Sequence, residues 1–127
     1  MSGAEDLSKL AQLMLNKGSY GKWRFFSQET YEKLMPRDLR KENPKIAVND
    51  TWFFCWYGVG IHPFYKPSED KNAMQYYGHG ASSGAVFKFD PKHQMFIVQA
   101  RDDNKSAKIN GEYQAKLDRL VWDSVAK

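Results

Sequence analysis

Residues 75–100, which read QYYGHGASSGAVFKFDPKHQMFIVQA, decide the fold expected for this chain. Three aromatic or apolar stretches are separated by a segment rich in glycine and serine and by the sequence Asp90-Pro91-Lys92-His93. Aromatic and β-branched residues favour strands, whereas Gly, Ser, Asp and Pro favour the turns between them. The segment therefore predicts three short antiparallel strands, over 75–80, 85–89 and 95–100.

Two helices are predicted ahead of these strands. Apolar residues recur at every third or fourth position from 7 to 15, which is the spacing of one helix face. Ser2 and Glu5 fit a capping box at the start of this helix. Ser27 is expected to cap a second, shorter helix, which Pro36 prevents from continuing.

The remaining elements complete the expected fold. Residues 52–61 are aromatic and β-branched and predict a strand bent at Gly58 or Gly60, while 112–126 carry an apolar helical stripe. Segregated helices and strands favour the α+β class. We expect an antiparallel sheet of about three to four strands, with a C-terminal helix packed on it and two N-terminal helices.

Length and composition favour one small packed domain. The chain has 127 residues, of which 42% are hydrophobic and 15% aromatic. We therefore expect a single domain over 1–127, with a helical part over 1–50 and a sheet with the last helix over 51–127. The longest apolar run, residues 52–57, is too short to span a membrane. The net charge of +4 comes from interleaved basic and acidic residues, so nucleic-acid binding is disfavoured.

Metal, cofactor and nucleophile motifs are not evident in the sequence. His62, His79 and His93 are 17 and 14 residues apart, unlike zinc-ligand spacing. Ser-x-x-Lys occurs at 19–22 and at 68–71, but neither stretch is predicted to be helical, so the lysine would not lie one turn from the serine. The sequence predicts no metal and no cofactor.

The segment Gly78-His79-Gly80-Ala81-Ser82-Ser83-Gly84 is the candidate site. Small residues let a ligand approach the backbone closely, and a backbone N–H on an edge strand can stabilise an oxyanion. An imidazole beside it can transfer a proton. On chemistry alone, a glycine-rich hairpin with an incidental histidine is the better interpretation.

Four stretches, taken in order, resemble the β-lactamase and penicillin-binding-protein family of serine hydrolases, which includes class C β-lactamases, esterases and D-Ala-D-Ala peptidases. Residues 4–18 resemble the helix after that family's second active-site motif, and 24–35 resemble its helix beginning leucine-leucine-serine-proline-glutamate-threonine. Residues 56–60 match its tyrosine-glycine-x-glycine strand. Residues 77–98 are similar to its third motif and the two strands that follow.

The resemblance implies roles for the glycine-rich segment. His79 stands at the Lys or His position of the third motif, and the backbone N–H of Ser82 would help to hold the oxyanion. Substrate would contact Gly80, Ala81, Ser83 and Gly84, with Ala81 replacing the family's usual glycine. The family's Ser-x-x-Lys helix and its Tyr-x-Asn motif have no counterpart here, so the resemblance implies a C-terminal portion of a hydrolase of amides or esters, inactive alone.

An incomplete fold predicts a partner. The resemblance implies that strand 95–100 lacks its neighbour, and an open apolar edge invites pairing. We expect a homo-oligomer, or binding of a missing N-terminal half, and in the intact protein a β-lactam, peptide or ester substrate. The family's usual compartment is periplasmic or secreted. The alternative function is a non-catalytic interaction or self-assembly module. Stacking of nucleic-acid bases on the aromatic residues is the weakest hypothesis.

Overall fold

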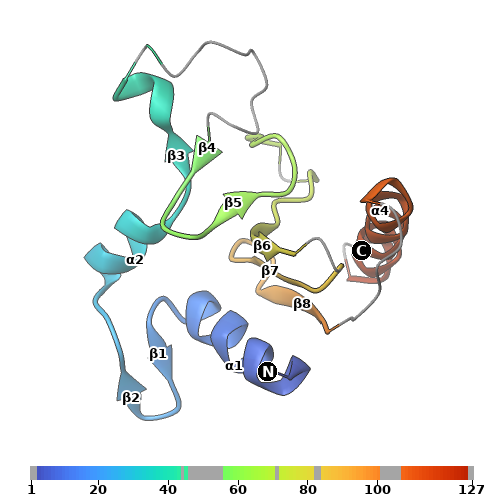
Figure 1. Ribbon diagram of the computed structural model, residues 1–127. Coiled ribbons are helices and arrows are strands. Elements are labelled where there is room, and N and C mark those ends of the chain that lie inside the picture. Colours follow the sequence, from blue (N-terminus) through green and yellow to red (C-terminus); the bar gives the residue numbers. More distant parts are fainter. Residues whose placement is uncertain are drawn as a thin grey trace.

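The computed structural model describes residues 3–43, 45, 56–70, 72–81, 84–100 and 107–125 (Figure 1). In that part of the chain the α-helices are α1 (Ala4–Leu15), α2 (Gln28–Leu34) and α4 (Ala107–Val125), and η1 (Leu39–Lys41) is a 3₁₀ helix. The strands are β1 (Ser19–Tyr20), β2 (Trp23–Arg24), β3 (Arg37–Asp38), β4 (Trp56–Tyr57), β5 (His62–Pro63), β6 (Tyr77–Gly80), β7 (Val86–Asp90) and β8 (Met95–Gln99).

The main sheet has the strand order β5-β6-β7-β8, and every neighbouring pair is antiparallel. In its centre Phe87 of β7 pairs with His79 on one side and with Val98 on the other. Two further hairpin-like pairs, β1-β2 and β3-β4, lie outside this sheet. The predicted α+β class and the predicted antiparallel sheet are therefore confirmed.

Helix α1 covers one face of the sheet and packs on β7 and β8 (Figure 1). Its apolar stripe contributes Met14 and Leu15, whose side chains are buried with Phe89 of β7. Tyr31 of α2 and Ile61 complete this cluster. At about 25 cal/mol per Å² of apolar surface removed from water, such burial is the main term that holds helix and sheet together.

Helix α4 lies over the opposite face (Figure 1). Successive side chains of a strand point to opposite faces, so Lys88 and Asp90 of β7 face away from α1. Lys88 forms an ion pair with Asp118 of α4, and the imidazole of His93 lies edge-on to Trp122, with ring centroids 4.5 Å apart. The C-terminal helix is thus packed on the sheet as the sequence predicts, and a buried ion pair is among its contacts.

The start of each N-terminal helix has an identifiable cap. Ser27 caps α2, where its hydroxyl oxygen accepts a hydrogen bond of 3.1 Å from the backbone N–H of Thr30, as predicted. Helix α1 differs from the prediction, because its N-cap is Gly3. The Asp6 carboxylate accepts a hydrogen bond from the Gly3 N–H at 3.4 Å, so Asp6 takes the role expected of Glu5.

Two predicted boundaries are wrong. The single strand expected over 52–61 is replaced, in its described part, by β4 and a turn closed by a 2.8 Å hydrogen bond from the Gly58 N–H to the Ile61 carbonyl. A Cβ at residue 58 would collide with the backbone of Leu34, so glycine allows the chain to approach α2 there. Helix α4 begins at Ala107 and not at 112. The prediction placed Gly111 in the turn before the helix, whereas it lies inside the helix.

Neither a membrane-spanning helix nor a metal cluster is seen in the described residues. None of the described helices combines the length and the apolar content needed to cross a bilayer. Within the same residues, no three His, Cys, Asp or Glu side chains come together as a group that could hold a metal ion. The lone Cys55 lies outside the described residues.

Candidate functional site

The glycine-rich segment forms the end of the β6-β7 hairpin. His79 and Gly80 are the last two residues of β6, and both are exposed. Beyond them the Ala81 N–H donates to the Ala85 carbonyl at 2.8 Å, and the Gly84 N–H donates to the Ala81 carbonyl at 2.9 Å. The predicted site residues Ser82 and Ser83 lie outside the described part of the chain. The Ala81 N–H is therefore used in closing the hairpin.

The sheet separates the remaining predicted site residues into two groups. His79 lines a groove on the α1 face. Gly80, Ala81 and Gly84 line a cavity on the α4 face. Adjacent residues of a strand face opposite sides of the sheet. His79 and its neighbour Gly80 therefore cannot both face the same pocket. The structure thus offers two separate candidate sites in place of the single one predicted.

The groove with His79 on its wall has a volume of about 500 Å³. Pockets of this size accommodate small molecules. Helices α1 and α2, the turn after β4 and strand β7 supply its other walls, which are apolar: Leu10, Met14, Phe26, Leu34, Val59, Gly60, Ile61 and Phe87. Among the described residues that line the groove, His79 is the one titratable side chain.

A second histidine, His62 of β5, lies beside His79, with ring centroids 5.7 Å apart and the rings nearly perpendicular. The two residues lie on neighbouring strands, where His62 is opposite Gly78, the residue before His79. Sequence spacing concealed the pair, since the two residues are 17 positions apart. The strand register would not have revealed it either, because opposite residues of a strand pair share a face and His79 is the neighbour of Gly78.

His62 is held firmly. Its side chain is buried, and its ring lies 4.8 Å from that of Phe64 and 5.8 Å from that of Tyr57, measured between centroids. Its Nδ1 is 3.2 Å from the Pro63 carbonyl oxygen. Burial lowers the pKa of His62 below its usual value; the Pro63 carbonyl opposes the shift, and the charge of a protonated His79 adds to it. His62 is therefore a neutral imidazole near pH 7.

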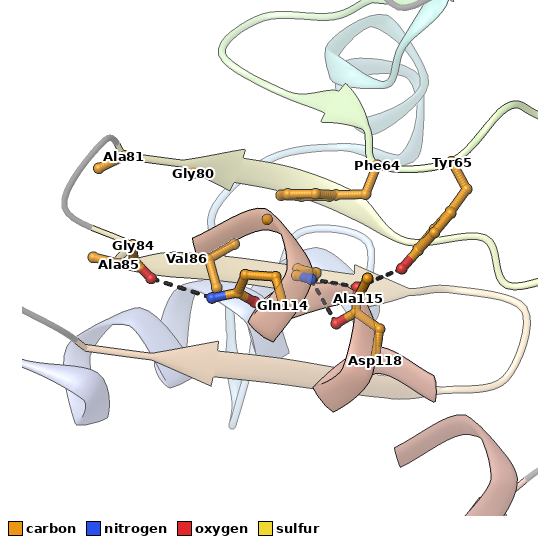
Figure 2. A pocket seen from close by; sticks show the side chains of 12 residues that line it. Phe64, Tyr65, Gly80, Ala81, Gly84, Ala85, Val86, Gln114, Ala115 and Asp118 are labelled. Atoms are coloured by element: carbon orange, nitrogen blue, oxygen red, sulfur yellow. Dashed lines mark hydrogen bonds and ion pairs between the residues drawn. The ribbon is translucent and has the colours of Figure 1, made fainter. Parts of the chain in front are cut away.

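The cavity on the α4 face has a volume of about 370 Å³ and contains a buried charge pair (Figure 2). The Lys88 ammonium lies 2.5 and 2.6 Å from the two Asp118 carboxylate oxygens, and the Tyr65 hydroxyl donates to Asp118 at 2.7 Å. The ammonium also lies 4.7 Å from the centroid of the Phe64 ring. Lys88 belongs to β7 and Asp118 to α4, whereas Phe64 and Tyr65 follow β5. Figure 2 shows Tyr65 pointing toward Asp118 in this cavity.

The chemistry of this cluster favours a structural role. Burial lowers the pKa of Lys88, and the hydrogen bond and charge of Asp118 oppose that shift. Burial, together with the hydrogen bond and negative charge of Asp118, raises the pKa of Tyr65 well above its usual value. Lysine and carboxylate neutralise one another, and each is almost completely buried. A pair engaged in this way joins α4 to β7 and is poorly placed to attack a substrate.

Comparison with known proteins gives one distant similarity. No protein-family model matches the chain. The chain is 28% identical, over 114 residues, to a curated protein named N-acetylmuramyl-L-alanine amidase from Bacillus subtilis (strain 168). The aligned region covers 87% of this chain and 23% of that protein, so the chain spans about a quarter of the length of the relative it matches.

This similarity overturns the assignment to β-lactamases and penicillin-binding proteins, and with it the function and the β-lactam or ester substrates inferred from that family. The finding supports, at most, a relationship to an amidase. The stretches that suggested the other family are short, and two of its three motifs have no counterpart in the sequence. The order of a few glycine- and aromatic-rich segments was therefore too weak a basis for that assignment.

Proposed function

We propose that the chain is an amidase-related domain that contributes the groove on the α1 face and His79 to hydrolysis of the amide between an N-acetylmuramyl group and L-alanine. The observation that carries this proposal is the similarity to the N-acetylmuramyl-L-alanine amidase, which extends over 87% of the chain. It is supported by an exposed imidazole on the wall of a groove large enough for a small molecule.

The reaction defines what His79 would do. Water adds across the amide bond, so that the carbonyl carbon gains a hydroxyl group and the alanine nitrogen gains a proton. An imidazole whose pKa lies near neutrality can take a proton from the attacking group and return one to the leaving nitrogen. Such proton transfer contributes about 100-fold to 10,000-fold to the rate of a hydrolysis.

The groove supplies some of the requirements of that reaction and not others. Its apolar walls would hold the methyl groups of the substrate. Among the described residues that line it, no Ser, Thr, Cys, Asp or Glu side chain is present. The attacking group in this proposal is therefore water, or a side chain from outside the described residues.

Binding is the first test of the proposal. N-acetylmuramyl-L-alanine is titrated into the isotopically labelled chain, and chemical shifts are followed by NMR. We expect perturbations at His79 and at groove residues such as Ile61 and Phe87. N-acetylmuramic acid, which lacks the alanine, is the control ligand and should bind more weakly. Perturbations confined to the α4 face, or none at saturating ligand, would contradict the proposal.

Hydrolysis is the second test. Release of L-alanine from N-acetylmuramyl-L-alanine is measured for the chain and for His79→Gln, which should lose at least about 100-fold in rate if His79 transfers the proton. His93→Gln is the matched control, because His93 is bonded to Asp90 and packs on Trp122, away from the groove. Equal rates for the wild type and His79→Gln would remove His79 from the reaction.

A second candidate function, self-association, is favoured by strand β8. Within the described residues β8 is an edge strand, paired with β7 alone, and its sequence Met-Phe-Ile-Val-Gln carries no charge and no proline. Natural edge strands usually carry a charged residue or a proline, and these residues prevent pairing with another chain. An antiparallel strand can pair with its own copy about a two-fold axis, so the occupant proposed for this edge is a second copy of the chain.

Sedimentation velocity over a range of concentrations tests self-association. We expect a dimer whose population rises with concentration and falls in Val98→Lys, which places a charge on the edge strand. Val59→Lys is the control, because Val59 is exposed on the turn after β4. Thermal unfolding of both variants verifies folding. A wild-type chain that stays monomeric at every concentration contradicts this second candidate.

A further inference from the structure

We propose that His62 is a positioning residue for His79: the buried ring of His62 fixes the orientation of the exposed imidazole. The inference deepens the role of His79 in the proposed amidase function and rests on it. Its evidence, however, is the packing of the two rings, which exists whether or not the chain hydrolyses an amide.

The two histidines differ in how firmly they are held. His79 ends strand β6 with an exposed side chain and borders the groove. His62 is buried, packs on aromatic rings at centroid distances of 4.8 and 5.8 Å, and contacts the carbonyl oxygen of the next residue. A buried, fixed ring beside an exposed one limits the rotamers available to the exposed ring.

The orientation of the rings suits this role. They are inclined by 67° at a centroid distance of 5.7 Å, which is an edge-to-face arrangement. The edge of an aromatic ring is electropositive and its face electronegative, so this arrangement is attractive while at least one ring is neutral. If both imidazoles were protonated, two positive charges would lie at that short distance.

The described surroundings of His79 are apolar. Around His79 the groove presents Leu10 and Met14 of α1, Leu34 of α2 and Phe87 of β7. Among the groups against His62 are the rings of Tyr57 and Phe64, the Pro63 carbonyl and His79 itself. His62 is thus the buried member of the pair, and His79 is the member that faces solvent and the groove.

The role predicts a specific dependence on pH. A positive charge on His79 disfavours protonation of His62 and so lowers the pKa of His62 further than burial does alone. Removal of His79 should allow His62 to protonate at higher pH. Removal of His62 should release the His79 ring to sample more rotamers, and His62→Phe, which keeps a ring against Phe64, should disturb that orientation less than His62→Ala.

The test is an NMR pH titration of the imidazole resonances in the full chain. In His79→Gln we expect the titration midpoint of His62 to move upward, by more than that of His93 in the same sample. His93 is the internal reference because it lies on the other face, beside Asp90 and Trp122. An unchanged His62 midpoint in a folded His79→Gln chain would overturn the inference.

A kinetic test separates this inference from the proposed function. If L-alanine is released, His62→Ala should lower kcat with little change in KM and alter the pH profile, and His62→Phe should restore part of kcat. If no alanine is released but the His62 midpoint still moves in His79→Gln, the coupling holds and the amidase proposal fails. If hydrolysis requires His79 but His62→Ala leaves kcat and the pH profile unchanged, the positioning role fails alone.

Discussion

The α1 face and the α4 face of the sheet are built from alternate residues of the same strand, yet they are held by different interactions. Phe87 and Phe89 point toward α1, which packs closely on β7 and β8 through apolar side chains. Lys88, between them in sequence, points toward α4 and reaches it through an ion pair. Helix α1 is held by burial of apolar surface, which changes little when the helix shifts slightly. Helix α4 is held by an ion pair, which depends on the exact position of two charged groups.

The largest effect is expected on the α4 face. Asp118→Ala leaves the Lys88 ammonium buried without its counter-ion and should destabilise the chain by about 3–5 kcal/mol. Asp123→Ala is the matched control, because it removes an exposed pair with Arg119 worth about 1 kcal/mol or less. Urea denaturation measures both. Similar losses in the two variants would mean that the buried pair does not hold α4 in place.

The same pair allows a sharper test of what it does. Replacing both partners, Lys88→Met with Asp118→Leu, removes two buried charges and leaves an apolar contact of similar size. Such replacements are often neutral or stabilising, so the double variant should recover most of the stability lost in Asp118→Ala. A double variant as unstable as the single one would show that Tyr65, which also bonds to Asp118, dominates the cluster.

The α1 face should respond to the loss of volume. Phe89 is completely buried in the core cluster, so Phe89→Ala should cost about 3–5 kcal/mol through lost burial and an unfilled cavity. Phe25, which is 66% exposed, is the control, and Phe25→Ala should change stability by less than about 0.5 kcal/mol. The loss in Phe89→Ala should be nearly independent of pH between 5 and 9, because no ionisable group is removed.

The free energy of unfolding at alkaline pH depends on tyrosines of both faces. Burial raises the pKa of Tyr31, on the α1 face, to about 12, whereas an unfolded tyrosine loses its proton near pH 10. Between these values the unfolded state binds fewer protons than the folded state, so stability falls as pH rises, by about 1.4 kcal/mol per pH unit for one tyrosine. Burial raises the pKa of Tyr65 and Tyr76, on the α4 face, in the same direction.

Lys88 acts with the opposite sign. Its pKa is lowered in the folded state, so below the usual lysine value the unfolded state binds more protons and stability rises with pH. The two effects should partly cancel up to about pH 10.5, above which the tyrosines act alone. Urea titrations at several pH values, with Tyr31→Phe as the variant, measure the balance. A Tyr31→Phe chain with an unchanged alkaline slope would assign the loss to the α4 face.

The sequence predicted one of these faces better than the other. Helical spacing identified the apolar stripe of α1, and the aromatic and apolar stretches between turn residues in 75–100 identified β6, β7 and β8, because both signals are local in the sequence. The pairing of Lys88 with Asp118 joins residues 30 positions apart and leaves no local pattern. His62 was missed for the same reason, since a two-residue strand carries no periodicity.

The smallest expected effect concerns the support of the α1 face by α2, which carries Tyr31 into the core. Ser27→Ala removes the hydroxyl that accepts the Thr30 N–H and should destabilise the chain by about 1 kcal/mol. Ser8→Ala is a matched control: Ser8 is a half-buried residue of α1, its hydroxyl donates a hydrogen bond to the Ala4 carbonyl, and alanine is the better helix former there. Urea denaturation should therefore show a loss for Ser27→Ala and no loss for Ser8→Ala. Equal stabilities would mean that packing of Tyr31 against the sheet fixes α2 without its cap, so that the α1 face depends on buried area alone.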